Sequence, residues 1–424
     1  MTTATRKLER YRKFDYEIPK KTLVWQLTGK GFESFHLEEI PVPTMGPKDI
    51  LFRSDTNGIC FSDVKIVNAG PEHPRLKGYD MVRDKVVPGH EISITVIAVG
   101  ENADPSIRVG DRYIVQADLI EYNTAVGYGV WGGMIQYGVF DERVQRYLIK
   151  ISNPETGYSQ ASLVEPWACI EASYYRADIL DRDRVVWVLG GGGPMGQMHI
   201  LRTLSMAKHG KLPGLRHVLV TDVSDERLAA VEDRFGELAS EAKVELLGVD
   251  PRKVDFDGLV QKIAPEGIDY IVACAQIADV VNDSRRYLKR YGVLNLFAGL
   301  KRGTGDLNLG DIHYDQHTIT GNTGSRMEDM EKVLALTERG ELDTNFSAGA
   351  VVGMRSGSEG VQAVAEGKVT NKTILYPQLP DLPLTRIEDL PKLVRFSPEV
   401  EAEVKAGRWS TRAEEEMLDE LLPI

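Results

Sequence analysis

Short stretches in which apolar and polar residues alternate fill the first part of the chain. From Thr22 onward they are bounded by Gly, Pro and Asn, a pattern typical of β-strands joined by tight turns. We therefore predict a compact, mostly antiparallel barrel or sandwich through about residue 155. The predicted strands have the sequences LVWQL, SFHLEEI, DILFRSD, ISITVIAVG and RYIVQADL.

The pattern changes near Ser162, where a helix is predicted for LVEPWACIEASYYRA. From Val185 apolar strands alternate with helical segments, which is typical of a parallel sheet covered by helices on both faces. We expect a helix over Met327–Arg339 to return the chain to the first region, with NKTILYP as the last strand. The alternating elements are the strands VVWVLG, HVLVTD, VELLGV, DYIVACA, GVLNLFAG and HTITGN and helices over 196–209, 225–242, 258–264 and 279–289.

A cluster of glycines lies where the first of these apolar strands meets a helix. Gly191, Gly193 and Gly196 have the spacing of a dinucleotide-binding turn. In such a turn the first glycine makes the sharp bend, the second lets the backbone approach a pyrophosphate, and the third lets helix and strand pack closely. Pro194 and Met195 lie between these glycines as further candidate cofactor-binding residues, and the N-terminus of the following helix offers free N–H groups to phosphates. A glycine-rich turn that binds nothing is the alternative.

An acidic residue follows the second apolar strand, at Asp222. A carboxylate at this point accepts hydrogen bonds from the ribose hydroxyls of an adenosine and repels a 2′-phosphate. The interval from Gly196 to Asp222 exceeds the usual ~20 residues, and we place the excess in a loop insertion over 208–216. We therefore predict NAD as the cofactor rather than NADP.

Composition narrows the class of protein. A chain of 424 residues with 42% hydrophobic and 27% charged residues is typical of a soluble protein of two or three domains. Its net charge of -12 argues against nucleic acid or an anionic membrane as the main partner. The charged N-terminus does not have the pattern of a signal peptide, no apolar run approaches the ~20 residues that span a bilayer, and three scattered cysteines fit a reducing cytoplasm.

Four candidate zinc ligands lie outside the glycine-rich region: Cys60, His90, Glu91 and Glu165. A catalytic zinc typically has three ligands of these types and one open position. An alcohol oxygen bound there loses its proton near neutral pH, and its carbon can then release hydride to a nicotinamide. Taken singly, each residue also has a structural interpretation, as a buried thiol, a core histidine or an acid at a helix N-terminus.

The chain contains an ordered set of motifs, which are GICFSD, VPGHE, VGDR, the pair Glu165–Pro166, and LGGGGPMG followed by VTD. This set resembles that of the zinc-dependent medium-chain dehydrogenase/reductase family, which includes alcohol and sorbitol dehydrogenases. The resemblance implies an α/β protein with a GroES-like, β-rich catalytic domain, a Rossmann domain with a doubly wound parallel sheet, and an active site in the cleft between them. The expected bounds are 1–168 for the catalytic domain (with an extension over 1–21, either a solvated tail or a strap), 169–324 for the Rossmann domain, and 325–424 for the return to the catalytic domain and a C-terminal extension.

The resemblance also implies roles for single residues. Cys60 and His90 match zinc ligands, and Glu165 matches a variable ligand position that is acidic in the polyol branch. Glu91 matches an acid that ligates zinc in some states and lies just outside the ligands in others. Ser62 matches the hydroxyl that takes the substrate proton.

The resemblance also gives Asp63 a role and Lys65 a position in the active site. Asp63 matches the acid that orients the histidine ligand. Lys65 stands where many alcohol dehydrogenases continue the proton relay through a histidine, so it either meets an anion or is solvated. The region 111–140 lacks the cysteines of a second, structural zinc. We therefore predict one catalytic zinc and no structural zinc, with the loop YNTAVGYGVWGG held by packing.

A narrower resemblance is to the sorbose 1-phosphate reductase branch, and it is carried by CFSDVK, VGYGVWGG, EPWACIEASY and the tail YPQLPDLPLTRIEDLP. It implies hydride transfer between NAD(H) and a small, sugar-derived secondary alcohol or ketone, such as a ketose or polyol phosphate. A solvated loop is the favoured interpretation of the basic segment 71–85, and phosphate binding is the alternative. That segment contains Arg75, Lys77, Arg83 and Lys85.

Two further functions stay open beside this one. The first is a dehydrogenase of a non-phosphorylated polyol, cyclitol or amino alcohol. The second is a non-catalytic NAD-binding sensor, against which the complete set of Cys60, Ser62, His90 and Glu165 argues. By family analogy the expected assembly is a homodimer or homotetramer.

Overall fold

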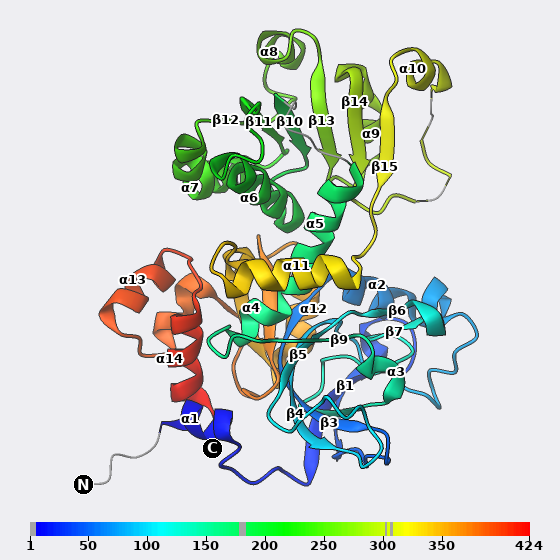
Figure 1. Cartoon of the computed structure of the whole chain (residues 1–424), viewed down its shortest axis with the longest axis vertical. Helices are drawn as coiled ribbons and strands as arrows, with labels where there is room; N and C mark the ends of the chain where they lie inside the picture. Colours follow the sequence, from blue (N-terminus) through cyan, green and yellow to red (C-terminus); the bar gives the residue numbers. More distant parts are fainter. Residues whose placement is uncertain (1–5, 178–183, 302, 306–307) are drawn as a thin grey trace. The chain divides into compact units, whose positions relative to one another are not determined.

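The computed structural model describes residues 6–177, 184–301, 303–305 and 308–424. Contacts divide the chain into two units, each built on its own sheet (Figure 1). The first unit comprises the chain up to Trp167 together with Arg326–Ile424, and the second comprises Ala168–Ser325. Among the described residues, no helix combines the length and the apolar character that crossing a membrane requires.

The first unit is built on a mainly antiparallel sheet, as the alternating sequence pattern predicts. In the described residues its strands follow the order β18-β16-β17-β3-β4-β5-β9, and β8 also pairs with β3. Large apolar side chains such as Phe52, Phe140 and Ile94 are fully buried against this sheet. The bounds are β3 Ile50–Ile59, β4 Glu91–Val99, β5 Arg112–Val115, β8 Tyr137–Phe140, β9 Leu148–Lys150, β16 Ala348–Gly353, β17 Lys372–Tyr376 and β18 Thr385–Arg386.

Smaller elements surround this sheet. The strands β1 Lys21–Leu27 and β2 Phe35–Pro41 form an antiparallel pair, and β6 Asp118–Leu119 pairs with β7 Thr124–Ala125. The helices of this part of the chain are α1 Lys7–Lys13, α2 Phe61–Ala69, α3 Glu142–Gln145, α4 Tyr158–Ser162, α11 Met327–Glu338, α12 Gly357–Ala365, α13 Pro398–Lys405 and α14 Thr411–Leu421. Helix α5 Val164–Ala177 begins in the first unit, and its residues from Ala168 onward belong to the second.

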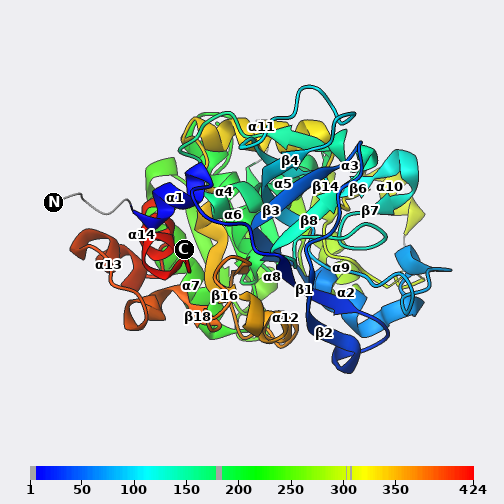
Figure 2. The same cartoon turned by 90° about the horizontal axis from the view of Figure 1, so that it is seen from below.

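The two ends of the chain pack against each other within the first unit. Helices α1 and α14 lie side by side in both Figure 1 and Figure 2. The backbone N–H of Leu8 donates to Asp419 at 3.0 Å, and Lys7 donates to the carbonyl of Glu420 at 2.9 Å. Tyr11 is buried and donates to Asp55 at 2.8 Å, so the N-terminal extension is a strap rather than a solvated tail.

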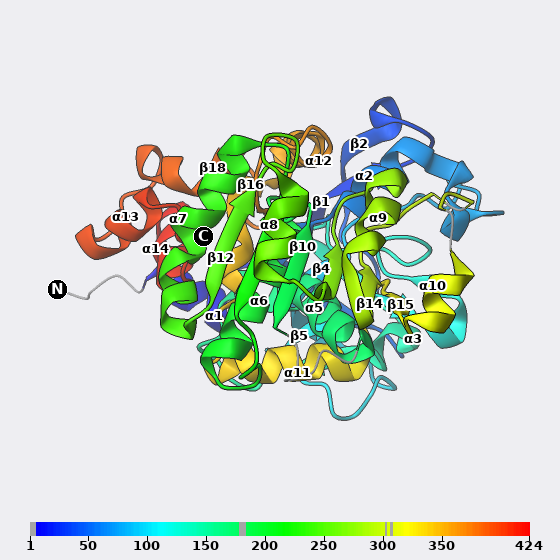
Figure 3. The same ribbon diagram turned by 90° about the horizontal axis from the view of Figure 1, so that it is seen from above.

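The second unit has the six-stranded parallel sheet that the strand and helix alternation predicts (Figure 3). Its described strands follow the order β12-β11-β10-β13-β14-β15, which is the doubly wound order of a Rossmann fold. The five residues of β10 are all buried, because helices cover both faces of the sheet. The bounds are β10 Val185–Leu189, β11 His217–Thr221, β12 Glu245–Val249, β13 Ile268–Ala273, β14 Leu288–Leu296, β15 Thr318–Gly321, α6 Pro194–Lys208, α7 Asp225–Ala242, α8 Phe256–Ile263, α9 Ala278–Ser284 and α10 Leu309–Tyr314.

Two local predictions are wrong. The helix expected over 279–289 ends at Ser284, and Leu288 and Lys289 already belong to strand β14. The reason is tertiary: Leu288 pairs with Ile268, and Lys289 forms an ion pair with Asp269. The segment NKTILYP is a strand, but β18 follows it. The sequence pattern also missed strand β16 and helices α2, α10 and α12.

Candidate metal centre and dinucleotide turn

Pairing of β3 with β4 brings together three of the candidate metal ligands. Gly58, near the end of β3, lies opposite Glu91, the first residue of β4. Cys60 follows β3 at once, and His90 precedes β4. As a result the ligand atoms of Cys60, His90 and Glu91 all lie within 4.8 Å of one another. A thiol, an imidazole nitrogen and a carboxylate form a donor set suited to zinc.

Asp63 holds this cluster from its protein side. It is the third residue of α2, and one carboxylate oxygen accepts the backbone N–H of Cys60 at 2.8 Å. The other oxygen accepts the N–H of Gly89 at 3.1 Å and lies 3.6 Å from His90 Nδ1. These contacts direct His90 Nε2 toward Cys60 and Ser62, as expected of a ligand whose second nitrogen faces a carboxylate.

The electrostatics of the cluster favour a positive charge on His90. Burial by itself would lower the pKa of His90, but its hydrogen bonds to Asp63 and Cys60 outweigh burial and raise the pKa well above 6.5. A bound cation supplies the same positive charge in place of that proton. Metal binding at this cluster is therefore expected to release a proton.

The hydroxyl of Ser62 lies against two of the candidate ligands. It donates to Cys60 Sγ at 2.9 Å and lies 3.3 Å from His90 Nε2. Ser62 is half-buried, and its hydroxyl lies at the edge of the cluster. This is the position that a proton-transferring group requires.

Sequence reasoning missed Lys372, which pairs with Glu91. Both side chains are buried, and Lys372 donates to Glu91 Oε1. The second oxygen, Glu91 Oε2, is buried and has no hydrogen-bond partner, so it is available to a cation. Burial would lower the pKa of Lys372, but the charges of Glu91 and Cys60 outweigh it and raise that pKa. The only signal in the sequence was a lysine in an otherwise apolar strand.

Glu165 lies near the cluster but outside the group of ligand atoms within 4.8 Å. It stands in the first turn of α5 and is buried. The pKa of Glu165 is raised to about 7, chiefly because the side chain is buried; the charge of His90 opposes this rise and the charge of Glu91 adds to it. Glu165 is thus close enough to act electrostatically on the cluster.

The glycine-rich turn of the second unit has the close contacts that its spacing predicts, with one difference. A Cβ at Gly196 would lie 2.5 Å from the Cα of Gly191, so helix α6 and strand β10 approach closely. A Cβ at Gly191 would lie 2.5 Å from a methyl group of Val220. The left-handed backbone of the sharp bend falls at Gly190, with a φ of 75°, and not at Gly191 as expected.

The turn leaves the N-terminus of α6 open. Gly193 precedes the helix and provides no side-chain cap, Pro194 and Met195 open it, and a Cβ at Gly193 would meet nothing within 4 Å. Asp222 follows β11 and reaches back to this turn, where it accepts the N–H of Gly192 at 3.1 Å. Open N–H groups beside a carboxylate suit a pyrophosphate and a ribose, respectively.

Most of the basic segment 71–85 is already engaged. Arg83 pairs with Asp84, Arg75 pairs with Asp118, and Lys85 donates to Gln26 at 2.9 Å. Arg75 differs from the others because its guanidinium lies 5.1 Å from the ring of Tyr128. That ring lies 6.4 Å from the ring of His90, so Tyr128 is a common neighbour of Arg75 and of one candidate ligand.

Lys65 is exposed on α2, and its ammonium lies 5.6 Å from the ring of Phe61. The loop YNTAVGYGVWGG is packed, as expected: Tyr128 and Val130 are buried, and Trp131 donates to the carbonyl of Lys85 at 2.9 Å.

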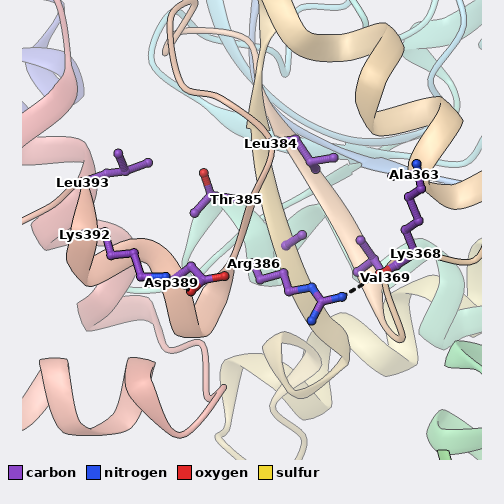
Figure 4. Close-up of a pocket in the computed structure, with 10 residues that line it drawn as sticks. Ala363, Lys368, Val369, Leu384, Thr385, Arg386, Asp389, Lys392 and Leu393 are labelled. Carbon is purple, nitrogen blue, oxygen red and sulfur yellow. Dashed lines mark hydrogen bonds and ion pairs between the residues drawn. The ribbon is translucent and has the colours of Figure 1, made fainter.

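A cavity of about 470 Å³ lies elsewhere in the first unit (Figure 4). Its wall includes Leu384, Arg386 and Lys392, and Arg386 donates to the carbonyl of Lys368 at 3.2 Å. None of the candidate metal ligands lines this cavity, so it is separate from the candidate metal centre.

A thiol–imidazole–carboxylate cluster in a β-rich unit, joined to a Rossmann unit, defines a zinc-type dehydrogenase. Comparison with known families agrees. Residues 46–153 match the alcohol dehydrogenase GroES-like domain, and residues 203–339 match the zinc-binding dehydrogenase family. The chain belongs to the zinc-dependent medium-chain dehydrogenase/reductase family of oxidoreductases.

Several relatives match nearly the whole chain, and two of them are named for an activity. A mannitol-1-phosphate 5-dehydrogenase of Aliivibrio fischeri is 26% identical over 92% of this chain and 96% of its own length. An L-sorbose 1-phosphate reductase of Klebsiella pneumoniae is 27% identical over 92% of this chain and 95% of its own. The fold matches that of 2R,3R-butanediol dehydrogenase from Bacillus subtilis, with a TM-score of 0.69, 22% identity, and coverage of 84% of this chain and 99% of that one.

Proposed function

We propose that this protein is an NAD(H)-linked, zinc-dependent oxidoreductase that interconverts a polyol phosphate and a ketose phosphate. The observation that carries the proposal is the cluster of Cys60, His90 and Glu91, whose ligand atoms lie within 4.8 Å of one another. The names of the two relatives that match the chain almost end to end support a phosphorylated sugar-derived substrate. In the described part of the chain no second group of this kind occurs, which supports one zinc per chain.

The residues of the first unit divide the chemical work. Zinc, when bound, polarises the substrate oxygen, and the nicotinamide exchanges hydride with the adjacent carbon. Cys60 and His90 hold the metal, with Glu165 and Glu91 as the candidates for the third ligand. Ser62 exchanges the hydroxyl proton of the substrate, because its oxygen lies beside both Cys60 and His90.

The cofactor site belongs to the second unit. The open N-terminus of α6 after Gly193 receives the pyrophosphate, and Gly191 and Gly196 let strand and helix form that turn. Asp222 accepts the ribose hydroxyls and disfavours a 2′-phosphate, which supports NAD rather than NADP. Titration with NADH and NADPH, followed by fluorescence, tests this assignment directly.

Arg75 is the residue that we assign to the substrate phosphate. Its guanidinium lies over the ring of Tyr128, which is also a neighbour of His90, whereas Arg83 on the same segment is bound to its neighbour Asp84. A guanidinium binds phosphate through two parallel hydrogen bonds. Binding requires Arg75 to exchange its present partner, Asp118, for the substrate.

A second candidate function is oxidation of a non-phosphorylated polyol. The ion pair of Arg75 with Asp118 favours it, because an arginine that already has a carboxylate partner is less available to an anion. In that case the basic segment has only a structural role.

The experiment that separates the two functions is NADH oxidation with sorbose 1-phosphate beside free sorbose and fructose at equal concentration. We expect a strong preference for the phosphate ester. Arg75→Gln should raise KM for the ester by about 10- to 100-fold, the effect of losing a ~1.4–2.8 kcal/mol charge-assisted contact. Arg83→Gln is the control, and its KM for the ester should equal that of the wild type. Preference for the free sugars would overturn the phosphorylated substrate while leaving the dehydrogenase in place.

A further inference from the structure

A buried carboxylate from the C-terminal extension joins two segments that lead to the metal centre. Glu414, on α14, is only 1% exposed. It accepts the backbone N–H groups of Tyr158 and Ser159, each at 2.7 Å, and the hydroxyl of Tyr376 at 2.8 Å. A buried carboxylate is costly unless it is well hydrogen-bonded, and three donors meet that requirement.

The two N–H donors belong to the segment that positions Glu165. Tyr158 and Ser159 form the start of α4, which continues through Leu163 into α5, and Glu165 is the second residue of α5. The fit is close, since a Cβ at Gly157 would lie 2.9 Å from Glu414 Oε2. Any shift of Glu414 would therefore move the first turn of α4 and, through it, the start of α5.

The third donor belongs to the strand that carries Lys372. Tyr376 ends β17, and Lys372, which begins that strand, donates to Glu91. Strand β17 also pairs with β3, where Thr373 lies opposite Ile59, the residue before Cys60. One carboxylate thus connects the Glu165 segment with the strand next to Cys60 and Glu91.

Other residues hold α14 in place around this contact. Trp409, just before α14, donates to the hydroxyl of Ser159 at 3.2 Å. On the opposite side Glu415 pairs with Arg12 of α1. The C-terminal extension is therefore anchored both to α4 and to the N-terminal strap.

We propose that Glu414 is a positioning residue for the metal centre: by binding the start of α4 and the end of β17 together, it fixes the placement of Glu165 and of the Lys372–Glu91 pair. This inference rests on the proposed function, because it assumes that these residues serve a bound metal. It gives the C-terminal extension a role in metal affinity.

The test compares Glu414→Gln with Glu415→Gln, a matched change one residue along the same helix. Zinc affinity is measured on the full-length protein by competition with a chromophoric chelator, and amide hydrogen exchange is followed over residues 156–166. Groups that orient metal ligands typically change metal affinity by 10- to 100-fold, and we expect a loss of about tenfold for Glu414→Gln. Exchange over 156–166 should accelerate. Glu415→Gln breaks only a partly exposed ion pair with Arg12, a kind of contact that contributes little to stability, so it should match the wild type in both readouts.

Tyr376→Phe keeps the test decisive if Glu414→Gln does not fold, because it removes the hydroxyl of β17 that donates to Glu414 and leaves the two backbone N–H contacts of Glu414 in place. We expect a loss of zinc affinity of about three- to tenfold for this variant. Unchanged zinc affinity in a folded Glu414→Gln, or in Tyr376→Phe, would overturn the proposal and leave the extension with a structural role alone. Failure of the wild type to bind zinc would instead overturn the proposed function, and the wild-type measurement shows this separately.

Discussion

At the scale of single residues, the candidate metal centre depends as much on side chains that are not ligands as on those that are. Asp63 fixes both the backbone of Cys60 and the orientation of His90. Lys372 holds one oxygen of Glu91 and leaves the other without a partner. Such outer contacts set the basicity and direction of metal ligands.

Ser62 provides the most specific prediction at this scale. Ser62→Ala removes the hydroxyl that we assign to proton transfer but leaves every candidate ligand in place. We expect kcat to fall by about 10²- to 10⁴-fold, the usual contribution of a proton-transferring group, with zinc content unchanged. Ser106→Ala, at an exposed site in the same unit, is the control. A variant that keeps full activity would exclude Ser62 from proton transfer.

His199, on α6, predicts a pH dependence of stability. It is fully buried, and burial lowers the pKa of His199 from 6.5 to about 3. Because the folded-state pKa lies below the unfolded one, the stabilising contribution is complete above pH 6.5 and is lost as the pH falls from 6.5 toward 3. The expected loss is about 1.4 kcal/mol per pH unit for a single proton.

Urea unfolding at pH 7.0, 6.0 and 5.0 measures this slope. His199→Gln should have a shallower loss of stability toward acid than the wild type has. His209→Gln is the control, since His209 follows the same helix but is exposed. Identical slopes for the wild type and His199→Gln would show that His199 does not contribute to the acid sensitivity.

At the scale of elements, the glycines of the dinucleotide turn meet two different requirements, close packing of helix on strand and close approach of a ligand. Gly196 serves packing, because a Cβ there would lie 2.5 Å from the Cα of Gly191. Gly193 has free space around it in the protein, so its lack of a side chain matters only for a ligand. The same motif therefore contains a structural glycine and a binding glycine.

The two glycines predict different behaviour on substitution. Gly193→Ala should leave the unfolding free energy nearly unchanged but weaken NADH binding by about tenfold, equivalent to ~1.4 kcal/mol. Gly196→Ala should lower both the stability and the affinity. Thermal unfolding together with NADH titration distinguishes them, and equal stability losses in both variants would contradict the assignment.

Elements also mark where sequence reasoning succeeds and where it does not. Short β-like segments between turn residues predicted the sheet of the first unit, and apolar strands alternating with helices predicted the parallel sheet of the second. Lys289 was placed in a helix, since its strand position depends on Asp269, which is distant in the sequence. Strand β16 was missed because its sequence, AGAVVG, is rich in small residues and lacks a clear strand pattern.

The candidate site shows the same division. Cys60, His90, Glu91 and Asp63 belong to short motifs, so their chemistry was visible in the sequence. Lys372 and Glu414 were not predicted, because their importance comes only from the residues that they meet far away in the chain. The bend at Gly190 was misplaced by one residue because the run of four glycines offers several equivalent turns.

At the scale of the whole molecule, the two units divide the proposed reaction. The first unit contains the candidate metal ligands and the second contains the dinucleotide turn. The N- and C-terminal extensions both belong to the first unit, where α1 packs on α14 and Glu414 reaches α4. Two relatives named as sugar-phosphate enzymes align with 92% of the chain. The expected homodimer or homotetramer stays a prediction.

The measurement that tests the central claim most directly is the zinc content of the wild type and of Cys60→Ser, determined by elemental analysis beside NADH oxidation. We predict about one zinc per chain in the wild type, as for a single catalytic site, with both the metal and the activity lost in Cys60→Ser. Two zinc ions per chain would contradict the single site. If Cys60→Ser retains one zinc per chain, whether or not it is active, the assignment of Cys60 is contradicted, and with it the candidate metal centre.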